Sequence, residues 1–219
     1  MTSAAASLVG KTFQEILRTP PPAVSAGVGG LIDMALFWKA AGPSRYFAQS
    51  EEFDRQLVER YSRIYPEAYA EKLTPTIPSA SAETSGESML AEQHLGMVLL
   101  LDQFPRNAFR GSPKQYQSDR LAKKWAEIAI EHGLNRKVDE SVELFFYLPW
   151  GHSENLEDQD KGLREAERIG GQFLGAAREH REVIARFGRF CHRNEVLGRE
   201  STEEEKEWLA NEAHAWAKS

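Results

Sequence analysis

The chain has 219 residues, a length that suits one or two domains, with a formal net charge of -6 and a pI near 5.6. This acidic balance argues against a protein that binds nucleic acid or an anionic membrane with its whole surface. The single cysteine, Cys191, excludes an intramolecular disulfide and favours a reducing compartment, so we expect a cytoplasmic protein. We also expect no membrane span, because no apolar run approaches the ~18 residues needed to cross a bilayer.

Residues 1–30 are rich in Ala, Ser, Gly and Pro, and three consecutive prolines from Pro20 block helix continuation. We expect a flexible arm over this range, with a short helix around Phe13 to Leu17. From Leu31 onward apolar residues recur at helical spacing. The sequence therefore predicts a single helical domain over residues 31–219.

In that domain a helix is expected to begin near Glu51, and Pro66 ends or kinks it. A polar segment follows this helix. Residues 70–86 contain two prolines and many small polar residues, a composition that offers little apolar surface for packing. This range is long for a loop in a compact domain. We expect it to be a mobile loop or lid.

Two further helices are expected in the middle of the chain. Thr84 and Glu87 form a capping-box pattern at the start of the first, which should stop before Pro105. Pro113 suits the first turn of the second, and Gly133 stands where it should end.

The last third of the chain is expected to hold three helices. One begins near Asp139 and stops at Pro149, and the longest runs to Phe187, because apolar residues recur at steps of three and four from Leu163. The last starts at a Ser201/Glu204 capping box. No segment shows alternating β-branched residues, so the predicted fold class is all-α, with antiparallel helical hairpins. We expect a tetratricopeptide-like superhelix or bundle, although no repeat of about 34 residues is legible.

A first polar block, LLLDQFPRNAFRG, ends an apolar run at residues 99–111. In one interpretation Asp102 forms a structural ion pair with an arginine, which makes the block an internal clamp. In the other, the guanidinium group of Arg106 and the neighbouring Asn107 bind a carboxylate or phosphate ligand. Both interpretations stay open, because the block contains more than one arginine and each can have a different role.

A second block, FFYLPWGHSENLEDQ, covers residues 145–159. His152 and Glu154 lie two residues apart in an expected loop, where a carboxylate can orient an imidazole and raise its basicity. These two residues are the candidate catalytic acid/base pair. The alternative is an ordinary helix start, with Ser153 as the cap and Glu154 at the positive end of the helix dipole.

A third block covers residues 180–205 and is locally basic, because six arginines stand against three glutamates between Arg178 and Arg199. Such an excess suits an anion site. The arginines within the predicted helix are interpreted as a solvated face. The candidates for ligand binding follow Gly188 in an expected non-helical turn. They are Arg189, His192, Arg193 and Asn194.

Two more histidines, His94 and His180, occupy core-facing stripes of predicted helices. Each is either a buried core residue or, if both point into one interior, part of a ligand-binding pair. Neither a His-Glu-x-x-His motif nor paired cysteines occur in the sequence, so we expect no metal and no other cofactor.

The three blocks together resemble the motifs of a large family of bacterial and fungal proteins known as a domain of unknown function. The strings are LLLDQFPRN, YLPWGHSENLEDQ and RFGRFCHRNEVLGRESTEEE, and the resemblance covers roughly residues 31–217, with Phe37-Trp38 near its start. It implies a tetratricopeptide-like helical fold and carries no reaction. The sequence departs from the family pattern at Cys191, where proline is usual, and after Trp38, where Lys-Ala-Ala-Gly replaces Phe-Gly.

These observations lead to one expected function and one alternative. We expect an enclosed pocket of arginine, histidine and carboxylate side chains for a small anionic or polar metabolite, with metal-independent acid/base chemistry. The alternative is a tetratricopeptide-like adaptor whose groove binds a peptide or protein partner. In a third interpretation every charged motif is an internal clamp. Neither nucleic acid nor a membrane is an expected partner, and the oligomeric state is left open.

Overall fold

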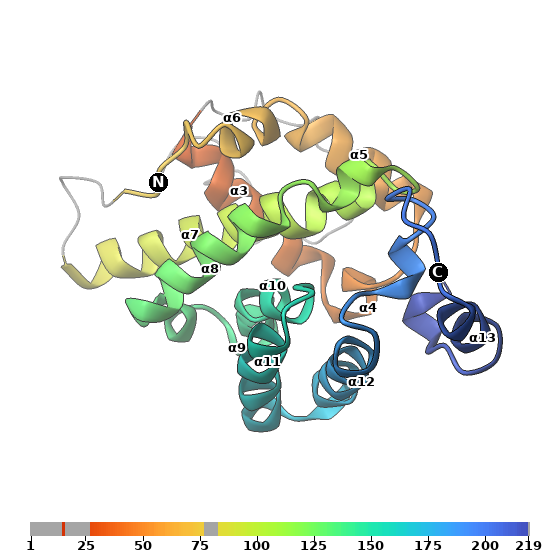
Figure 1. Ribbon diagram of the computed structural model, residues 1–219. Helices are drawn as coiled ribbons and strands as arrows, with labels where there is room; N and C mark the ends of the chain where they lie inside the picture. Colours follow the sequence, from red (N-terminus) through yellow and green to blue (C-terminus); the bar gives the residue numbers. More distant parts are fainter. Residues whose placement is uncertain (1–14, 16–26, 77–82, 219) are drawn as a thin grey trace. The chain divides into compact units, whose positions relative to one another are not determined.

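The computed structural model describes residues 15, 27–76 and 83–218 (Figure 1). These residues form helices and connecting segments without any β-strand, which confirms the all-α class for this part of the chain. They group into two compact units. The N-terminal unit comprises Met1–Arg110 and Lys114–Phe146, and the C-terminal unit comprises Gly111–Pro113 and Tyr147–Ser219. The expected tetratricopeptide-like repeat stays a prediction.

The N-terminal unit is organised around one long helix, α7, against which α3, α5, α6 and α8 pack. Figure 1 shows α8 running beside α7. The α-helices are α3 (Val28–Ala41), α4 (Pro43–Tyr46), α5 (Glu51–Tyr61), α6 (Tyr65–Tyr69), α7 (Glu83–Ala108), α8 (Asp119–Glu131) and α9 (Glu140–Glu143). The short 3-10 helices are η1 (Pro113–Tyr116), η2 (Leu134–Lys137) and η3 (Leu144–Phe146).

The C-terminal unit is built on two helices that pack side by side, α11 and α12, as Figure 1 shows. Its elements are α10 (Leu148–Gly151), α11 (Leu156–Ile169), α12 (Gly171–Phe187), η4 (Cys191–Arg193), α13 (Glu203–Asn211) and η5 (Ala215–Ala217). One apolar cluster joins the end of α12 to η4, α13 and η5. Its buried members are Val183, Ile184, Phe190, Cys191, Trp208, Ala213 and Ala217.

The aromatic pair at the start of the family-like region belongs to the core of the N-terminal unit. The rings of Phe37 and Phe53 stack with centroids 5.7 Å apart, and Trp38 meets Phe145 edge to face at 5.6 Å. Offset and edge-to-face contacts of this kind are the favoured arrangements of aromatic rings. The motif Phe37-Trp38 therefore anchors α3 and does not belong to the candidate site.

The expectation that a helix stops before Pro105 is wrong, because α7 continues through this residue to Ala108. A proline inside a helix leaves the carbonyl four residues earlier without its usual N–H donor. In this structure that carbonyl belongs to Leu101, and the hydroxyl of Ser118 donates a hydrogen bond to it at 2.6 Å. The replacement donor comes from a distant residue, so the local pattern could not reveal it.

Other predicted boundaries also need correction. The helix expected from Leu163 to Phe187 is two helices that meet at Gly170, whose φ of 78° ends the first of them. The segment from Asp139 to Pro149 is broken into α9, η3 and the start of α10. The capping box lies one residue later than expected, at Thr202 and Glu205.

The expected loop at 70–86 ends earlier than predicted, and its mobility stays a prediction. Residues from Glu83 onward already belong to α7, so Thr84 lies inside the helix and is not its cap. Leu73 is buried, and the side-chain amide of Gln93 bonds both the N–H and the carbonyl of Thr76, at 2.8 and 3.0 Å. Within this segment, residues 77–82 lie outside the described part of the chain.

At the other predicted boundary, α3 begins at Val28, inside the expected arm of residues 1–30. The short helix expected around Phe13 to Leu17 lies outside the described residues except for Glu15, which is helical.

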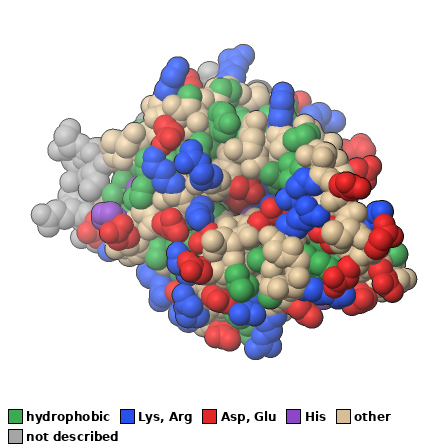
Figure 2. All heavy atoms as spheres, in the orientation of Figure 1, with side chains coloured by type: hydrophobic (Ala, Val, Ile, Leu, Met, Phe, Trp, Pro, Cys, Tyr) green, Lys and Arg blue, Asp and Glu red, His purple; other side chains and the backbone are tan. Residues whose placement is uncertain are grey.

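The face of the molecule in Figure 2 carries acidic and basic side chains interspersed with one another. In the described part of the chain, no helix combines the length and the apolar character needed to span a membrane.

Candidate functional site

The first sequence block forms an ion-paired cluster in the N-terminal unit. Arg106 makes two parallel hydrogen bonds to the Asp119 carboxylate, at 2.9 and 3.0 Å, and lies 3.4 Å from a carboxylate oxygen of Asp102. Burial disfavours the charged guanidinium, but the two carboxylates outweigh it and raise the pKa of Arg106. Asn107 donates to the backbone carbonyl of Gln103. Arg106 and Asn107, both expected to bind a ligand, are thus engaged within the protein.

His94 lies in α7 of the same unit and is almost fully buried. Its Nδ1 is 2.9 Å from the carbonyl of Leu90, and its ring meets Trp125 edge to face. Burial lowers the pKa of His94, and the backbone hydrogen bond opposes this only in part. A ligand-binding pair of His94 and His180 was one of two interpretations of these residues, and it stays a prediction. The two histidines belong to different units.

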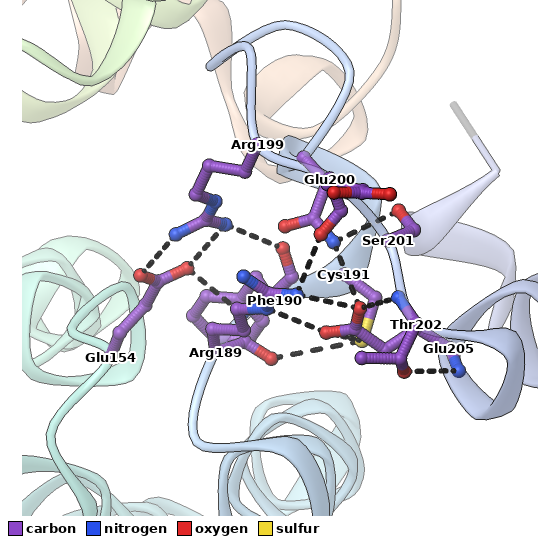
Figure 3. Close-up of polar contacts among 10 residues, drawn as sticks. Glu154, Arg189, Phe190, Cys191, Arg199, Glu200, Ser201, Thr202 and Glu205 are labelled. Atoms are coloured by element: carbon purple, nitrogen blue, oxygen red, sulfur yellow. Dashed lines mark hydrogen bonds and ion pairs between the residues drawn. The ribbon is translucent and has the colours of Figure 1, made fainter.

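In the C-terminal unit, Glu154 and Arg199 together hold one backbone residue (Figure 3). Glu154 accepts two hydrogen bonds from Arg199, at 2.7 and 3.0 Å, and a third from the backbone N–H of Phe190 at 2.8 Å. Arg199 also donates to the carbonyl of Phe190 at 3.0 Å. Burial disfavours the carboxylate, yet these bonds lower the pKa of Glu154. Both its oxygens are therefore engaged in fixing the chain.

A second ion-paired cluster, also drawn in Figure 3, surrounds the buried Glu205. Its carboxylate accepts from Arg189 at 2.6 and 2.7 Å, from the N–H of Thr202 at 2.8 Å and from Asn194 at 3.3 Å. These contacts, led by Arg189, lower the pKa of Glu205 to about 2. Arg189 and Asn194, both ligand-binding candidates, thus hold α13 to the preceding turn.

Cys191 lies beside the same carboxylate. Burial raises the pKa of its thiol to about 12, and the negative charge of Glu205 adds to the effect. A thiol with such a pKa stays protonated at neutral pH and is a poor nucleophile. Cys191 therefore acts as a small packed residue.

The Glu205 cluster predicts that the free energy of unfolding falls at acidic pH. The folded pKa of about 2 lies below the ordinary value of 4.5, so the unfolded state binds the proton more readily. The stabilisation from Glu205 is fully present above pH 4.5 and is lost as the pH falls from 4.5 towards 2. We expect Glu205→Gln to be less stable than the wild type at pH 7 and to lose less stability between pH 5 and pH 3, as measured by urea unfolding. Parallel pH profiles for the two proteins would contradict this assignment.

The remaining candidates gather around two aromatic rings of the C-terminal unit. The ring of His180, on α12, lies 4.2 Å from Trp216, 5.5 Å from Phe190 and 6.4 Å from His152 between centroids. His192 lies 5.3 Å from Trp216. The ring of His214 stacks on Trp216, with centroids 5.9 Å apart. We use the name histidine cluster for the four histidines His152, His180, His192 and His214 together with Phe190 and Trp216.

The loop that carries His152 is held from two sides. The side-chain amide of Gln159, in α11, lies within hydrogen-bonding distance of the carbonyls of Trp150, Gly151 and Ser153, at 3.3, 2.8 and 2.7 Å. The remaining carbonyl of this loop, that of His152 itself, accepts from Arg193 at 3.1 Å. Asn155, and not Ser153, caps α11. The loop is thus fixed by side chains that sequence reasoning had not linked to it.

His180 has unused hydrogen-bonding capacity. Neither of its ring nitrogens makes a hydrogen bond with any residue that the structure describes, while its ring packs against aromatic neighbours. Burial lowers the pKa of His180 well below 6.5, and the charges of His152, Arg193, His192 and His214 act in the same direction. At neutral pH His180 is therefore an uncharged imidazole with one nitrogen able to accept a proton.

Arg193 supplies a permanent positive charge close to His180. The side chain is buried, and its guanidinium carbon lies 4.3 Å from the centroid of the Phe190 ring, a cation–π contact. A guanidinium group stays charged at any physiological pH. The C-terminal unit therefore places a permanent cation and a neutral imidazole on the same aromatic residue.

The predicted site residues thus separate into two groups. His180, His192 and Arg193 meet around Phe190 with His152 beside His180, whereas Glu154 belongs to a backbone-fixing pair. Sequence reasoning missed Phe190, Arg199, His214 and Trp216, and it counted Arg199 only in a local charge excess. Among the described residues, no group of three or more His, Cys, Asp or Glu side chains is arranged to hold a metal ion.

Comparison with known proteins extends this picture. A family model described as "Bacterial protein of unknown function (DUF924)" matches residues 34–213. A solved structure of a protein of unknown function from Agrobacterium tumefaciens is 39% identical, with a TM-score of 0.72, and the match covers 82% of this chain and 96% of that one. No curated protein matches the chain. Neither the family nor the solved structure carries a described reaction.

Proposed function

This chain belongs to the DUF924 family of bacterial proteins of unknown function, and we propose that its histidine cluster binds a small anionic metabolite and acts on it by metal-independent acid/base chemistry. The observation that carries the proposal is the environment of His180. It is a neutral imidazole whose nitrogens make no hydrogen bond within the described chain, and it shares Phe190 with the buried cation Arg193.

An anionic ligand is favoured by the local charge. Arg193, His152 and His192 all act on His180 as positive or partly positive neighbours. The carboxylate that accepts from the Phe190 N–H, that of Glu154, is paired with Arg199. A negatively charged group next to Arg193 would therefore be attracted by a buried permanent cation.

The acid/base step follows from the protonation state of His180. A general base must be unprotonated and within reach of the proton that it removes. His180 meets the first condition at neutral pH because burial disfavours its charged form. A ligand anion held by Arg193 would stabilise the imidazolium that forms when His180 takes a proton. His152, whose ring lies 6.4 Å away, is placed to exchange that proton.

The proposal is tested by nitrogen-15 NMR of the histidine side chains while inorganic phosphate, succinate or citrate is added. We expect an anion to move the signals of His180 and His152 and to raise the pKa of His180, because negative charge favours the imidazolium. His180→Gln and Arg193→Gln should each weaken this binding at least about tenfold, which is about 1.4 kcal/mol.

The matched control is His132→Gln, because His132 is an exposed histidine of the N-terminal unit whose Nδ1 faces the carbonyl of Ile128. This variant should bind the anions as the wild type does. The proposal fails if no anion moves the His180 signal, or if His180→Gln and Arg193→Gln bind as tightly as the control.

A further inference from the structure

The Glu154–Arg199 ion pair joins two segments that are 45 residues apart in the chain. Glu154 lies in the loop between α10 and α11, and Arg199 lies in the turn that follows η4. They hold both polar groups of a single peptide residue, since the N–H of Phe190 bonds Glu154 and its carbonyl bonds Arg199. The pair therefore does more than join two charges, because it also binds the backbone of a third residue.

The residue that they hold stands at the centre of the histidine cluster. The Phe190 ring lies 5.5 Å from His180, 5.7 Å from His192 and 5.8 Å from Trp216, and it carries the guanidinium of Arg193 at 4.3 Å. Because Phe190 is almost fully buried, its ring has little room to adjust alone. A shift of its backbone therefore moves the cation and the imidazole relative to each other.

We infer that Glu154 and Arg199 are positioning residues, which fix Phe190 so that Arg193 and His180 face the same ligand. This inference rests on the proposed function for its consequence in binding. The geometry that it describes can be measured without any ligand.

The state of Glu154 supports this role over that of a catalytic acid. Each of its oxygens accepts a hydrogen bond from Arg199, and one also accepts from the N–H of Phe190. Its pKa is lowered, because these bonds outweigh the effect of burial, so it holds no proton to deliver near neutral pH. Glu154 therefore acts through Phe190 and not on a ligand.

The test compares two substitutions at this position. The amide of Glu154→Gln keeps an oxygen that can accept from Phe190 and Arg199, whereas Glu154→Ala removes the acceptor. We expect Glu154→Ala to release Phe190, so that water reaches the buried His180 imidazole and its pKa rises towards 6.5. Phosphate or citrate binding should weaken about tenfold, equivalent to about 1.4 kcal/mol. Glu154→Gln should keep the wild-type His180 pKa and bind within about threefold of the wild type, less than 1 kcal/mol.

Two further variants complete the design. Glu157→Ala removes a neighbouring exposed carboxylate whose side chain does not reach Phe190, and it should leave the His180 pKa and anion binding unchanged. Arg199→Gln removes the other half of the pair and should reproduce the His180 shift if Glu154→Ala fails to fold.

The outcomes separate positioning from two other roles. A Glu154→Gln variant as defective as Glu154→Ala would overturn the inference, because a catalytic acid is lost in both. An unchanged His180 pKa in folded Glu154→Ala or Arg199→Gln would overturn it too, since the pair would then contribute only stability. If the wild type binds no anion, the proposed function fails, and the His180 pKa alone still decides the positioning role.

Discussion

Replacing Gly96 with alanine is expected to lower the free energy of unfolding by at least about 3 kcal/mol, at the upper end of the cost of overpacking a core. Gly96 lies in α7 where this helix meets α3. A Cβ atom there would lie 3.0 Å from the Cα of Leu31, 2.6 Å from its carbonyl carbon and closer still to its oxygen. These are backbone atoms of a buried helix, so no side-chain rotation can relieve the clash.

The matched control is Gly175→Ala, in the middle of α12. Among the described residues, no atom outside the adjoining helix backbone lies within 4 Å of the position that its Cβ would take, and Gly175 is exposed. Alanine should stabilise this helix by about 0.5–1 kcal/mol, since glycine loses more backbone entropy on folding. Urea unfolding of both variants measures the difference. Equal stability of the two variants would show that α3 and α7 do not approach as closely as the structure describes.

The helical class was predictable because spacing of apolar residues is a local property, whereas the helix ends depend on distant partners. Pro105 would end an isolated helix, but Ser118 supplies the hydrogen bond that its ring removes. The apolar seam from Leu163 to Phe187 continues across a break at Gly170, because two helices packed side by side share the same spacing. Periodicity alone could not separate one long helix from two.

The sequence predicted which residue types gather at the candidate site. It did not predict the role of each residue. The third sequence block contained arginines of one apparent kind, yet Arg189 pairs with Glu205, Arg199 with Glu154, and Arg193 stacks on Phe190. Their roles differ because the partners of Arg189 and Arg199 lie 16 and 45 residues away in the chain, which a local motif does not encode. The block therefore identifies an arginine-rich region, and the partners decide the role of each arginine.

The cluster around Arg106 gives the second large expected effect on stability. The sequence suggested that truncation of Asp102 would remove the counter-ion of a buried cation. The structure gives Arg106 a second partner, because Asp119 makes two hydrogen bonds to it at 2.9 and 3.0 Å. Asp102, only 1% exposed, has its carboxylate facing Arg106 and the amide of Gln103. Removal of Asp102 therefore leaves Arg106 paired with Asp119, whereas removal of Arg106 takes the cation from both carboxylates.

We therefore expect Arg106→Ala to lower the free energy of unfolding by about 3–5 kcal/mol, because it takes away the cation that faces a buried carboxylate. Asp102→Ala should cost less, since Asp119 still pairs with Arg106. The control is Arg110→Ala, which breaks a more exposed pair with Asp54 and should cost at most about 1 kcal/mol.

Guanidinium unfolding of the three variants and of the double variant Arg106→Met, Asp102→Leu measures these differences. The double variant should recover part of the stability lost in Arg106→Ala, because apolar residues of similar size carry no charge to desolvate. If Asp102→Ala proves more destabilising than Arg106→Ala, the Asp119 pair does not compensate for the lost carboxylate. The Arg106 cluster would then depend mainly on Asp102, as the sequence alone had suggested.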